Sequence, residues 1–194
     1  MKHILFSTLL FISNYCFSQD TSDTVLYNKE FKWTLIIPEH FVQMKSDSVK
    51  AMHDRGMKAI EKSYKEKVED NTTGIFMFKN NRFNYFESCS QPFDTSVDGD
   101  YTASIRLVAS VVYNTFKSQI ENIEINSSSA IEKICGLEFH RINLTMHYPK
   151  GLVFYAVMYS RLFGKKELAL NIYYTDEIKG FQMLRAWRQS KFGN

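Results

Sequence analysis

The first regular pattern along the chain is an alternation of apolar and polar side chains between residues 31 and 37. The apolar members stand at every second position and are Phe31, Trp33, Leu35 and Ile37. Because successive side chains of a strand point to opposite faces, this spacing predicts a strand with one buried face. Pro38 ends the strand, and the polar residues 19–28 before it are expected to form a loose lead-in.

Two longer segments show the three- and four-residue spacing that is typical of an amphipathic helix. The first begins at the capping residues 46–48 and runs to about Glu69, with a loose apolar stripe. The second covers residues 101–121. Its apolar stripe is widened by Leu107 and Val111, and a wide stripe predicts a helix that is deeply packed.

Short strands are predicted between and after these helices. Residues 75–78 and 83–86 are aromatic, and the asparagines between them are typical of a hairpin turn because this residue tolerates positive φ. Alternating apolar residues between 130 and 174 predict an antiparallel meander. Near His140 and Arg141 the apolar residues change from odd-numbered to even-numbered positions, which predicts a β-bulge at that point.

A final helix closes the predicted fold. Asp176 stands before it as a cap. The helix residues expected to point inward are Phe181, Leu184 and Trp187. The order of elements predicts a single α+β domain over residues 29–194, built as an antiparallel β-sheet flanked by helices. No internal repeat, low-complexity segment or linker divides that range.

Residues 1–18 have the composition of a cleavable signal peptide. A short positive start precedes an apolar run over residues 4–12, and the small residues required before the cleavage point are Cys16 and Ser18. We therefore predict cleavage after Ser18 and export to the periplasm or the cell exterior. A lipid on Cys16 is disfavoured, because the bulky Tyr15 departs from the pattern that precedes a lipidated cysteine.

Hydropathy and charge argue against two further classes of protein. The apolar run of the signal is shorter than the about 20 residues that cross a bilayer, and no later segment predicts a transmembrane span. Cleavage removes Lys2 from the 24 basic residues and leaves all 21 acidic ones, so the exported chain has a net charge near +2. A charge this small gives no electrostatic case for binding nucleic acid.

The exported chain keeps two cysteines, Cys89 and Cys135. In an oxidising compartment they could form a disulfide, which would stabilise the fold by roughly 3–4 kcal/mol on the chain-entropy model. The alternative is two separate buried thiols. The sequence leaves both open.

No catalytic or metal-binding motif emerges from the residue spacing. The histidines of the exported chain form no close pair, and no cysteine joins them at a zinc spacing. These histidines are His40, His53, His140 and His147. The acidic cluster Asp94, Asp98 and Asp100 departs from a calcium loop and is better explained as a solvated polar loop. We expect no catalytic residue, no metal and no cofactor.

One polar stripe is a candidate binding face. Its members alternate with the apolar residues Ile142, Leu144 and Met146 of the meander. They are Arg141, Asn143, Thr145 and His147. Since the apolar residues face a core, the four polar side chains share the opposite face. A solvated strand face is the plain interpretation, and a rigid recognition surface is the alternative.

Three local motifs resemble those of the PsbP/Mog1-like family. The run over residues 31–41 is similar to the family's first strand and the Ile-Pro that ends it. Gly136 followed by Arg141 is similar to its entry into the meander, and residues 181–192 are similar to its closing helix. The resemblance covers residues 29–192 and implies an antiparallel sheet sandwiched between helices.

The resemblance implies a binding protein rather than an enzyme. The family consists mostly of accessory and binding proteins with differing partners, so no catalytic residue is implied for this chain. The end of the signal, Cys-Phe-Ser-Gln, is similar to signals of Bacteroidota-type bacteria. Three functions stay open: an accessory module bound to another envelope or extracellular protein, a domain holding a small apolar ligand between sheet and helix, and a hydrolase with a Ser or Cys–His–Asp geometry.

Overall fold

The computed structural model describes residues 25–65, 67 and 70–193. The predicted signal peptide and the lead-in as far as residue 24 lie outside the described residues. The strands are β1 (Val25–Asn28), β2 (Trp33–Ile36), β3 (Val42–Gln43), β4 (Thr73–Lys79), β5 (Tyr85–Pro92), β6 (Glu124–Ile134), β7 (Leu137–His147), β8 (Val153–Phe163), β9 (Lys166–Tyr174) and β10 (Lys191–Phe192). The helices are α1 (Ser46–Tyr64), α2 (Tyr101–Gln119) and α3 (Glu177–Arg188).

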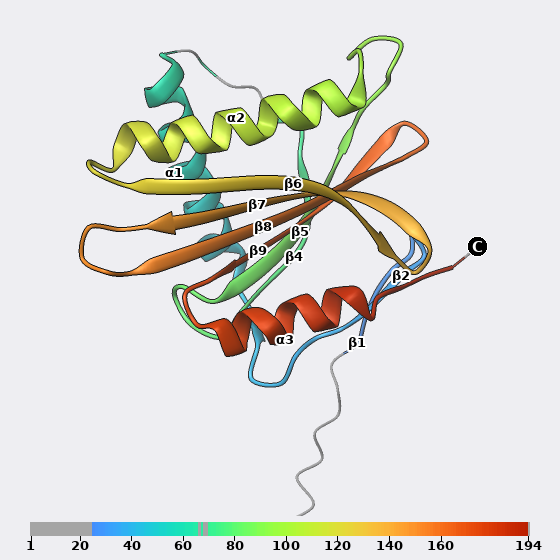
Figure 1. Ribbon diagram of the computed structural model, residues 1–194. Helices are drawn as coiled ribbons and strands as arrows, with labels where there is room; N and C mark the ends of the chain where they lie inside the picture. The colour runs from blue at the N-terminus through green and yellow to red at the C-terminus, as the bar shows by residue number, and fades with distance from the viewer. Residues whose placement is uncertain (1–24, 66, 68–69, 194) are drawn as a thin grey trace, which may run out of the picture.

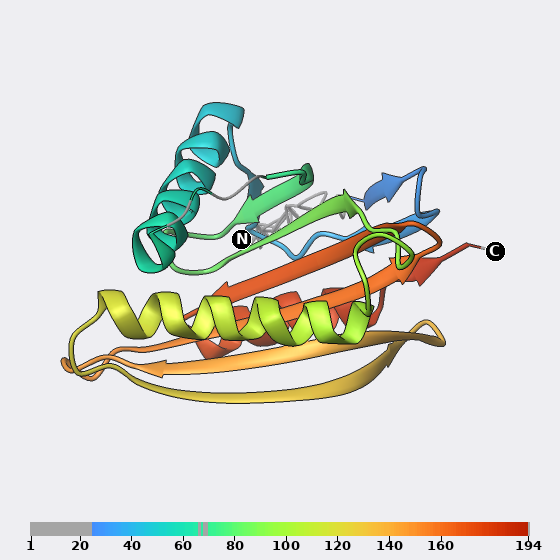
Figure 2. The same cartoon turned by 90° about the horizontal axis from the view of Figure 1, so that it is seen from above.

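The strands form two antiparallel sheets. The larger sheet has seven strands in the order β3-β4-β5-β9-β8-β7-β6, and the smaller has three in the order β1-β2-β10. Helices α1 and α2 lie over one face of the larger sheet, while α3 and the smaller sheet pack on the other face (Figure 1, Figure 2). The predicted α+β fold, an antiparallel sheet flanked by helices, is confirmed.

Each face of the larger sheet carries its own hydrophobic core. Phe139 of β7 packs with Trp187 of α3 on one face, and Ile142 packs with the α2 side on the other. Strand β7 therefore contributes Phe139 to one core and its later apolar residues to the other. This explains why its apolar residues change from odd-numbered to even-numbered positions. The bulge predicted near His140 and Arg141 is wrong, because both ladders of β7 run without a shift of register.

The strand predicted at residues 31–37 is confirmed, and its apolar side chains are 0–6% exposed. The lead-in behaves differently from the prediction over its last four residues. Val25–Asn28 form β1, because they pair with the whole of β2 in an antiparallel ladder. The predicted strand is thus β2, the central strand of the smaller sheet. Its apolar side chains pack in the same core as those of α3.

Helices α1 and α2 begin as predicted, but α1 ends before the predicted Glu69 and α2 is packed less deeply than predicted. α1 ends at Tyr64, and none of its residues is buried. α2 was expected to be deeply packed, yet Leu107 is 64% and Val108 is 44% exposed. Only one side of α2 contacts the sheet, so the wide apolar stripe extends past the interface into solvent.

Helix α3 presents a slightly different face from the predicted one. Leu184 and Trp187 are buried as expected, whereas Phe181 is 61% exposed. The buried positions next to it are Gly180 and Met183. Residue 180 lies so close to the Tyr174 ring of β9 that a Cβ there would be 2.5 Å from it. No helix of the described residues is long and apolar enough to cross a membrane.

Cys89 and Cys135 are separate free thiols. Cys89 lies in β5 and Cys135 in the turn between β6 and β7, with β9 and β8 between β5 and β7. At about 4.8 Å per strand, three strand steps separate the two residues by at least about 14 Å, beyond the about 7 Å limit for the Cα atoms of a disulfide. Of the two possibilities that the sequence leaves open, the structure has two separate thiols and no bridge between them, and Cys135 is exposed rather than buried.

Candidate functional site

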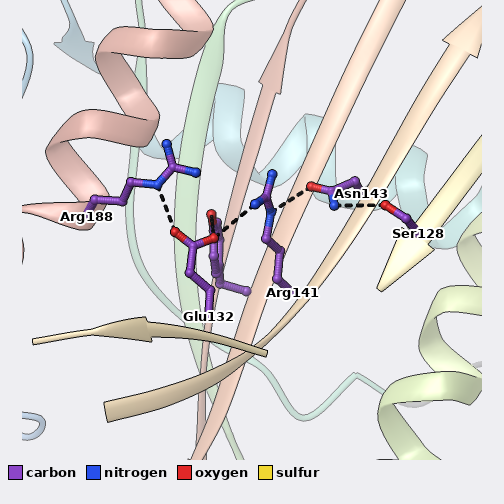
Figure 3. A network of polar contacts seen from close by, with 6 residues as sticks. Ser128, Glu132, Arg141, Asn143 and Arg188 are labelled. Atoms are coloured by element: carbon purple, nitrogen blue, oxygen red, sulfur yellow. Dashed lines mark hydrogen bonds and ion pairs between the residues drawn. The ribbon is translucent and has the colours of Figure 1, made fainter. Parts of the chain in front are cut away.

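The four residues of the predicted binding face lie on the face of β7 that is turned toward α3. Arg141, Asn143 and Thr145 are partly buried, and His147 is exposed. Arg141 Nε donates to Asn143 Oδ1 at 2.8 Å, and Asn143 Nδ2 donates to Ser128 Oγ on β6 at 3.1 Å (Figure 3). Arg141 and Asn143 are therefore held in fixed positions on the sheet.

Glu132 on β6 connects these contacts to helix α3. Its carboxylate accepts hydrogen bonds from Arg141 Nη1 at 3.0 Å and from Arg188 Nε at 2.8 Å (Figure 3). It also accepts a hydrogen bond from the Tyr159 hydroxyl at 3.0 Å. Burial alone would raise the pKa of Glu132, but the hydrogen bonds from Arg188 and Tyr159 and the charge of Arg141 keep that pKa below its ordinary value. Glu132 is therefore ionised at neutral pH. The polar network is Ser128, Glu132, Arg141, Asn143, Tyr159 and Arg188.

The polar network carries one net positive charge, because two guanidinium groups share one carboxylate. The guanidinium carbon of Arg141 also lies 5.9 Å from the centre of the Tyr159 ring. The side chains of Arg141 and Arg188 remain 26% and 42% exposed, so both stay accessible to an anionic group of a partner. Thr145 and His147 make no side-chain hydrogen bond within the part of the chain that the structure describes.

Sequence reasoning found Arg141 and Asn143 but missed Glu132 and Arg188. Glu132 stands opposite Phe139 in the β6–β7 ladder, and this register is not visible in the residue pattern alone. In the structure the turn between the two strands accounts for this register, because Cys135 and Gly136 both adopt positive φ. A two-residue hairpin turn of that kind fixes the register of its strands, whereas Arg188 is placed by the path of α3.

Strand β6 is an open edge of the larger sheet beside the polar network. In the described part of the chain, no strand pairs with its outer side. Residues 126–131 are exposed and contain neither a charge nor a proline. Sheet edges in natural proteins are usually protected by charged residues, prolines or bulges. The edge of β6 therefore presents accessible main-chain donors and acceptors over six residues.

A cavity of about 700 Å³ lies between α1 and the sheet. Helix α1 contributes Met52 and Gly56 to its wall, and the sheet contributes Met77, Glu87 and Cys89. Its volume falls in the range of about 300–1,000 Å³ that is usual for small-molecule sites. The apolar stripe of α1 thus faces a space that the protein's own side chains do not fill.

A second cavity, of about 500 Å³, adjoins the first one. Four side chains line both cavities: Met44, Met52, Tyr85 and Tyr173. The rest of its wall is largely aromatic, and its charged residues are Arg55, Lys79 and Arg82. The acidic and basic side chains of the first cavity are Lys50, His53, Asp70 and Glu87, so it has carboxyl groups where the second cavity has only cations.

The sheet side of the first cavity favours neutral groups. Burial raises the pKa of the Glu87 carboxyl, against the opposing effects of a hydrogen bond from Asn171 Nδ2 at 3.4 Å and the charge of His53. Burial also raises the pKa of the Tyr85 hydroxyl and that of the Cys89 thiol, the latter to about 12. At neutral pH Cys89 is thus a thiol and not the thiolate that nucleophilic catalysis requires.

Replacing Glu87 by glutamine is expected to stabilise the protein more at high pH than at low pH. Because the folded-state pKa is raised, the unfolded carboxyl loses its proton first as the pH increases. The stability of the wild type therefore falls from the unfolded pKa of about 4.3 up to the folded pKa, and the glutamine variant avoids this loss. Urea unfolding on both sides of this interval measures the difference.

The control for this experiment is Glu124→Gln, at the exposed start of β6. Its effect on the free energy of unfolding is expected to be small, because the side chain is exposed to solvent. An equal effect of Glu87→Gln at both pH values would contradict the assignment of a raised pKa to the cavity carboxyl.

The acidic loop has a structural role. Asp100 caps α2 by accepting a hydrogen bond from the Ala103 amide at 2.7 Å, and Asp94 pairs with Lys165 at 2.6 Å. Among the described residues, no three histidine, cysteine or acidic side chains gather in a group that could hold a metal ion. The carboxylates of this loop therefore satisfy the chain's own amides and charges.

No family model and no curated protein matches the chain. Among solved structures, the chain is similar to the solution structure of cyanobacterial PsbP (CyanoP) from Synechocystis sp. PCC 6803. The TM-score is 0.56 at 7% sequence identity, and the alignment covers 92% of this chain and 97% of that chain. A similarity at this identity concerns the fold alone. The chain thus has a PsbP-like fold, as its sequence motifs implied.

Proposed function

We propose that this protein is an exported, non-enzymatic accessory module that binds another protein of the cell envelope or exterior. The PsbP-like fold fits an accessory module in general, and residues 1–18 favour export. The raised pKa of Cys89 argues against a thiol hydrolase. The observation that carries the binding role is the open edge of β6 beside the polar network.

The edge of β6 suits the addition of an extended segment of a partner as one further strand. In this mode of recognition, main-chain hydrogen bonds supply affinity and neighbouring side chains supply specificity. Ser128 and Ala130 stand opposite Asn143 and Arg141 in the β6–β7 ladder, so they share the face of the polar network. Alternate side chains of an added strand would point to that same face.

The charge of the polar network selects the kind of segment that binds. Two guanidinium groups and one carboxylate leave a net positive charge at the end of the edge where Glu132 lies. A partner segment with an aspartate or glutamate that reaches Arg141 or Arg188 is therefore favoured, while a basic segment is opposed by like charge. We accordingly propose an acidic extended segment as the partner's contact.

Site-specific cross-linking in cells that express the protein tests this proposal. A photo-reactive amino acid at Ser129 is expected to capture one recurring partner. The cross-linked form of this chain is expected to begin at Gln19, after removal of the signal. The same probe at Val97, which is 80% exposed in a separate loop, is the control. The same diffuse set of products from both positions would contradict the proposal.

Proline variants separate the outer edge of β6 from its inner pairing. Adjacent strand residues direct their N–H groups to opposite edges, so one of Ser129→Pro and Ala130→Pro removes an outward N–H and the other disrupts the ladder with β7. The outward variant is identified by a nearly unchanged Tm. It is expected to weaken partner capture by about ten-fold. Full capture by that variant would show that binding does not use this edge.

A further inference from the structure

The two cavities beneath α1 adjoin each other and differ in chemistry. The first cavity contains Met57 and Met77 in addition to the shared methionines, together with Val49, Ile60 and Ile75. Its acidic and basic side chains have partners of their own, since Lys50 pairs with Asp54, His53 lies 3.0 Å from Asp70, and Glu87 accepts from Asn171. Methionine is flexible and polarisable, so it adapts to irregular apolar ligands. This end suits a flexible hydrocarbon chain rather than a rigid polar molecule.

The second cavity has a basic rim. Arg55 comes from α1, Lys79 from the end of β4, and Arg82 from the turn before β5. Within the described residues, no carboxylate lines this cavity and none forms an ion pair with the three cations. Arg82 is oriented by its own neighbour, since its guanidinium carbon lies 5.2 Å from the Phe83 ring centre. Three cations from three elements thus surround an opening that has no anion of its own.

We propose that this space binds a single-chain amphiphile with a carboxylate head group, of the fatty-acid class. The head group lies among Arg55, Lys79 and Arg82, and the chain runs past the side chains that both cavities share into the methionine-lined cavity. This site is separate from the edge of β6, because it lies on the opposite side of the larger sheet from the polar network.

The packing of α1 supports a chain-like ligand. No residue of α1 is buried, although the helix lies over the sheet with an apolar stripe. An apolar chain in the first cavity would cover that stripe and the facing side chains of β4 and β5, and such burial is favourable in proportion to the area removed from water.

The charge of each end decides the orientation of the ligand. A carboxylate gains charge-assisted hydrogen bonds at the basic rim, whereas an amine would meet three like charges there. At the other end, burial raises the pKa of Glu87 and so favours its neutral form, which a hydrocarbon chain tolerates. The acid is therefore bound with its head at the rim and its chain under α1.

Binding of laurate, compared with dodecanol and dodecylamine of the same chain length, tests the head group. Titration calorimetry on the folded, signal-free chain is expected to show that laurate binds about ten-fold more tightly than either analogue. The double variant Lys79→Gln, Arg82→Gln is expected to lose this advantage and to keep the affinity for dodecanol. Equal affinities of the wild type for laurate and dodecylamine would overturn the proposal.

Gly56 provides a variant that fills the cavity without crowding the helix. It lies in the cavity wall, and no heavy atom lies within 4 Å of a Cβ added there. Gly56→Phe is expected to abolish laurate binding at an unchanged or higher Tm, while Gly56→Ala keeps it. Unchanged laurate affinity in folded Gly56→Phe would overturn the site, as would binding to phosphatidylglycerol vesicles without binding of monomeric laurate, since the cations would then recognise a membrane surface.

Discussion

Replacing Trp187 by alanine is expected to lower the free energy of unfolding by about 3–5 kcal/mol, because it leaves a large cavity in the core. The side chain is 1% exposed and lies at the centre of an aromatic cluster. Its ring centre is 5.0 Å from Phe139, 5.4 Å from Tyr159, 5.7 Å from Trp33 and 6.1 Å from Phe192. Urea unfolding of the variant and the wild type measures the loss.

The matched pair Trp187→Phe and Trp33→Phe separates packing from hydrogen bonding in the same cluster. Trp33 Nε1 donates to the buried Ser190 hydroxyl at 3.0 Å, whereas Trp187 Nε1 is buried without a partner among the described residues. Both changes remove a similar ring area. Trp33→Phe also leaves Ser190 unsatisfied, which is expected to add about 1–3 kcal/mol to its cost.

The size of this difference decides between two accounts of the cluster. If both phenylalanine variants lose the same stability, the bond to Ser190 contributes nothing and ring packing alone holds the small sheet and α3 together. If Trp187→Ala costs less than Trp33→Phe, the cluster is able to collapse around the missing ring and is not tightly packed at its centre. Either result would contradict the expectation.

Elements that depend on local chemistry could be predicted from the sequence. The period-two pattern around Trp33 reports a buried strand face whatever that strand pairs with. Asp176 caps α3, as predicted, because its side chain accepts from the amides of Ile178 and Lys179 within the same turn. The PsbP-like fold follows from such elements in their order.

Features that depend on register or on distant contacts could not be predicted. Glu132 and Arg188 are 56 residues apart and meet only because the β6–β7 hairpin and α3 end at the same place. A disulfide between Cys89 and Cys135 was one possibility, because the sequence shows that two cysteines are present. It does not show that two strands separate β5 from β7 in the sheet. For α1, the amphipathic stripe shows which side of the helix is apolar. It does not show whether side chains of the sheet fill the space beside that stripe.

Replacing Gly180 by alanine is expected to destabilise the protein by about 1–3 kcal/mol, the usual cost of forcing an extra group into a packed core. A Cβ at residue 180 would lie 2.5 Å from Cδ2 and Cε2 and 2.7 Å from Cγ of the Tyr174 ring. That ring is held in place by stacking on Tyr155 at 4.7 Å. Since Cγ is not a flexible end, α3 or the ring pair must shift.

Gly56→Ala in α1 is the matched control for this effect. It makes the same change inside a helix at a position with no neighbouring atom, so it is expected to raise the free energy of unfolding by about 0.5–1 kcal/mol. Both variants make the same change in helix propensity. The opposite signs of their effects on the free energy of unfolding therefore isolate the contact between α3 and β9. A stabilising Gly180→Ala would show that Tyr174 moves aside freely, and the stacked tyrosines could then not fix the start of α3.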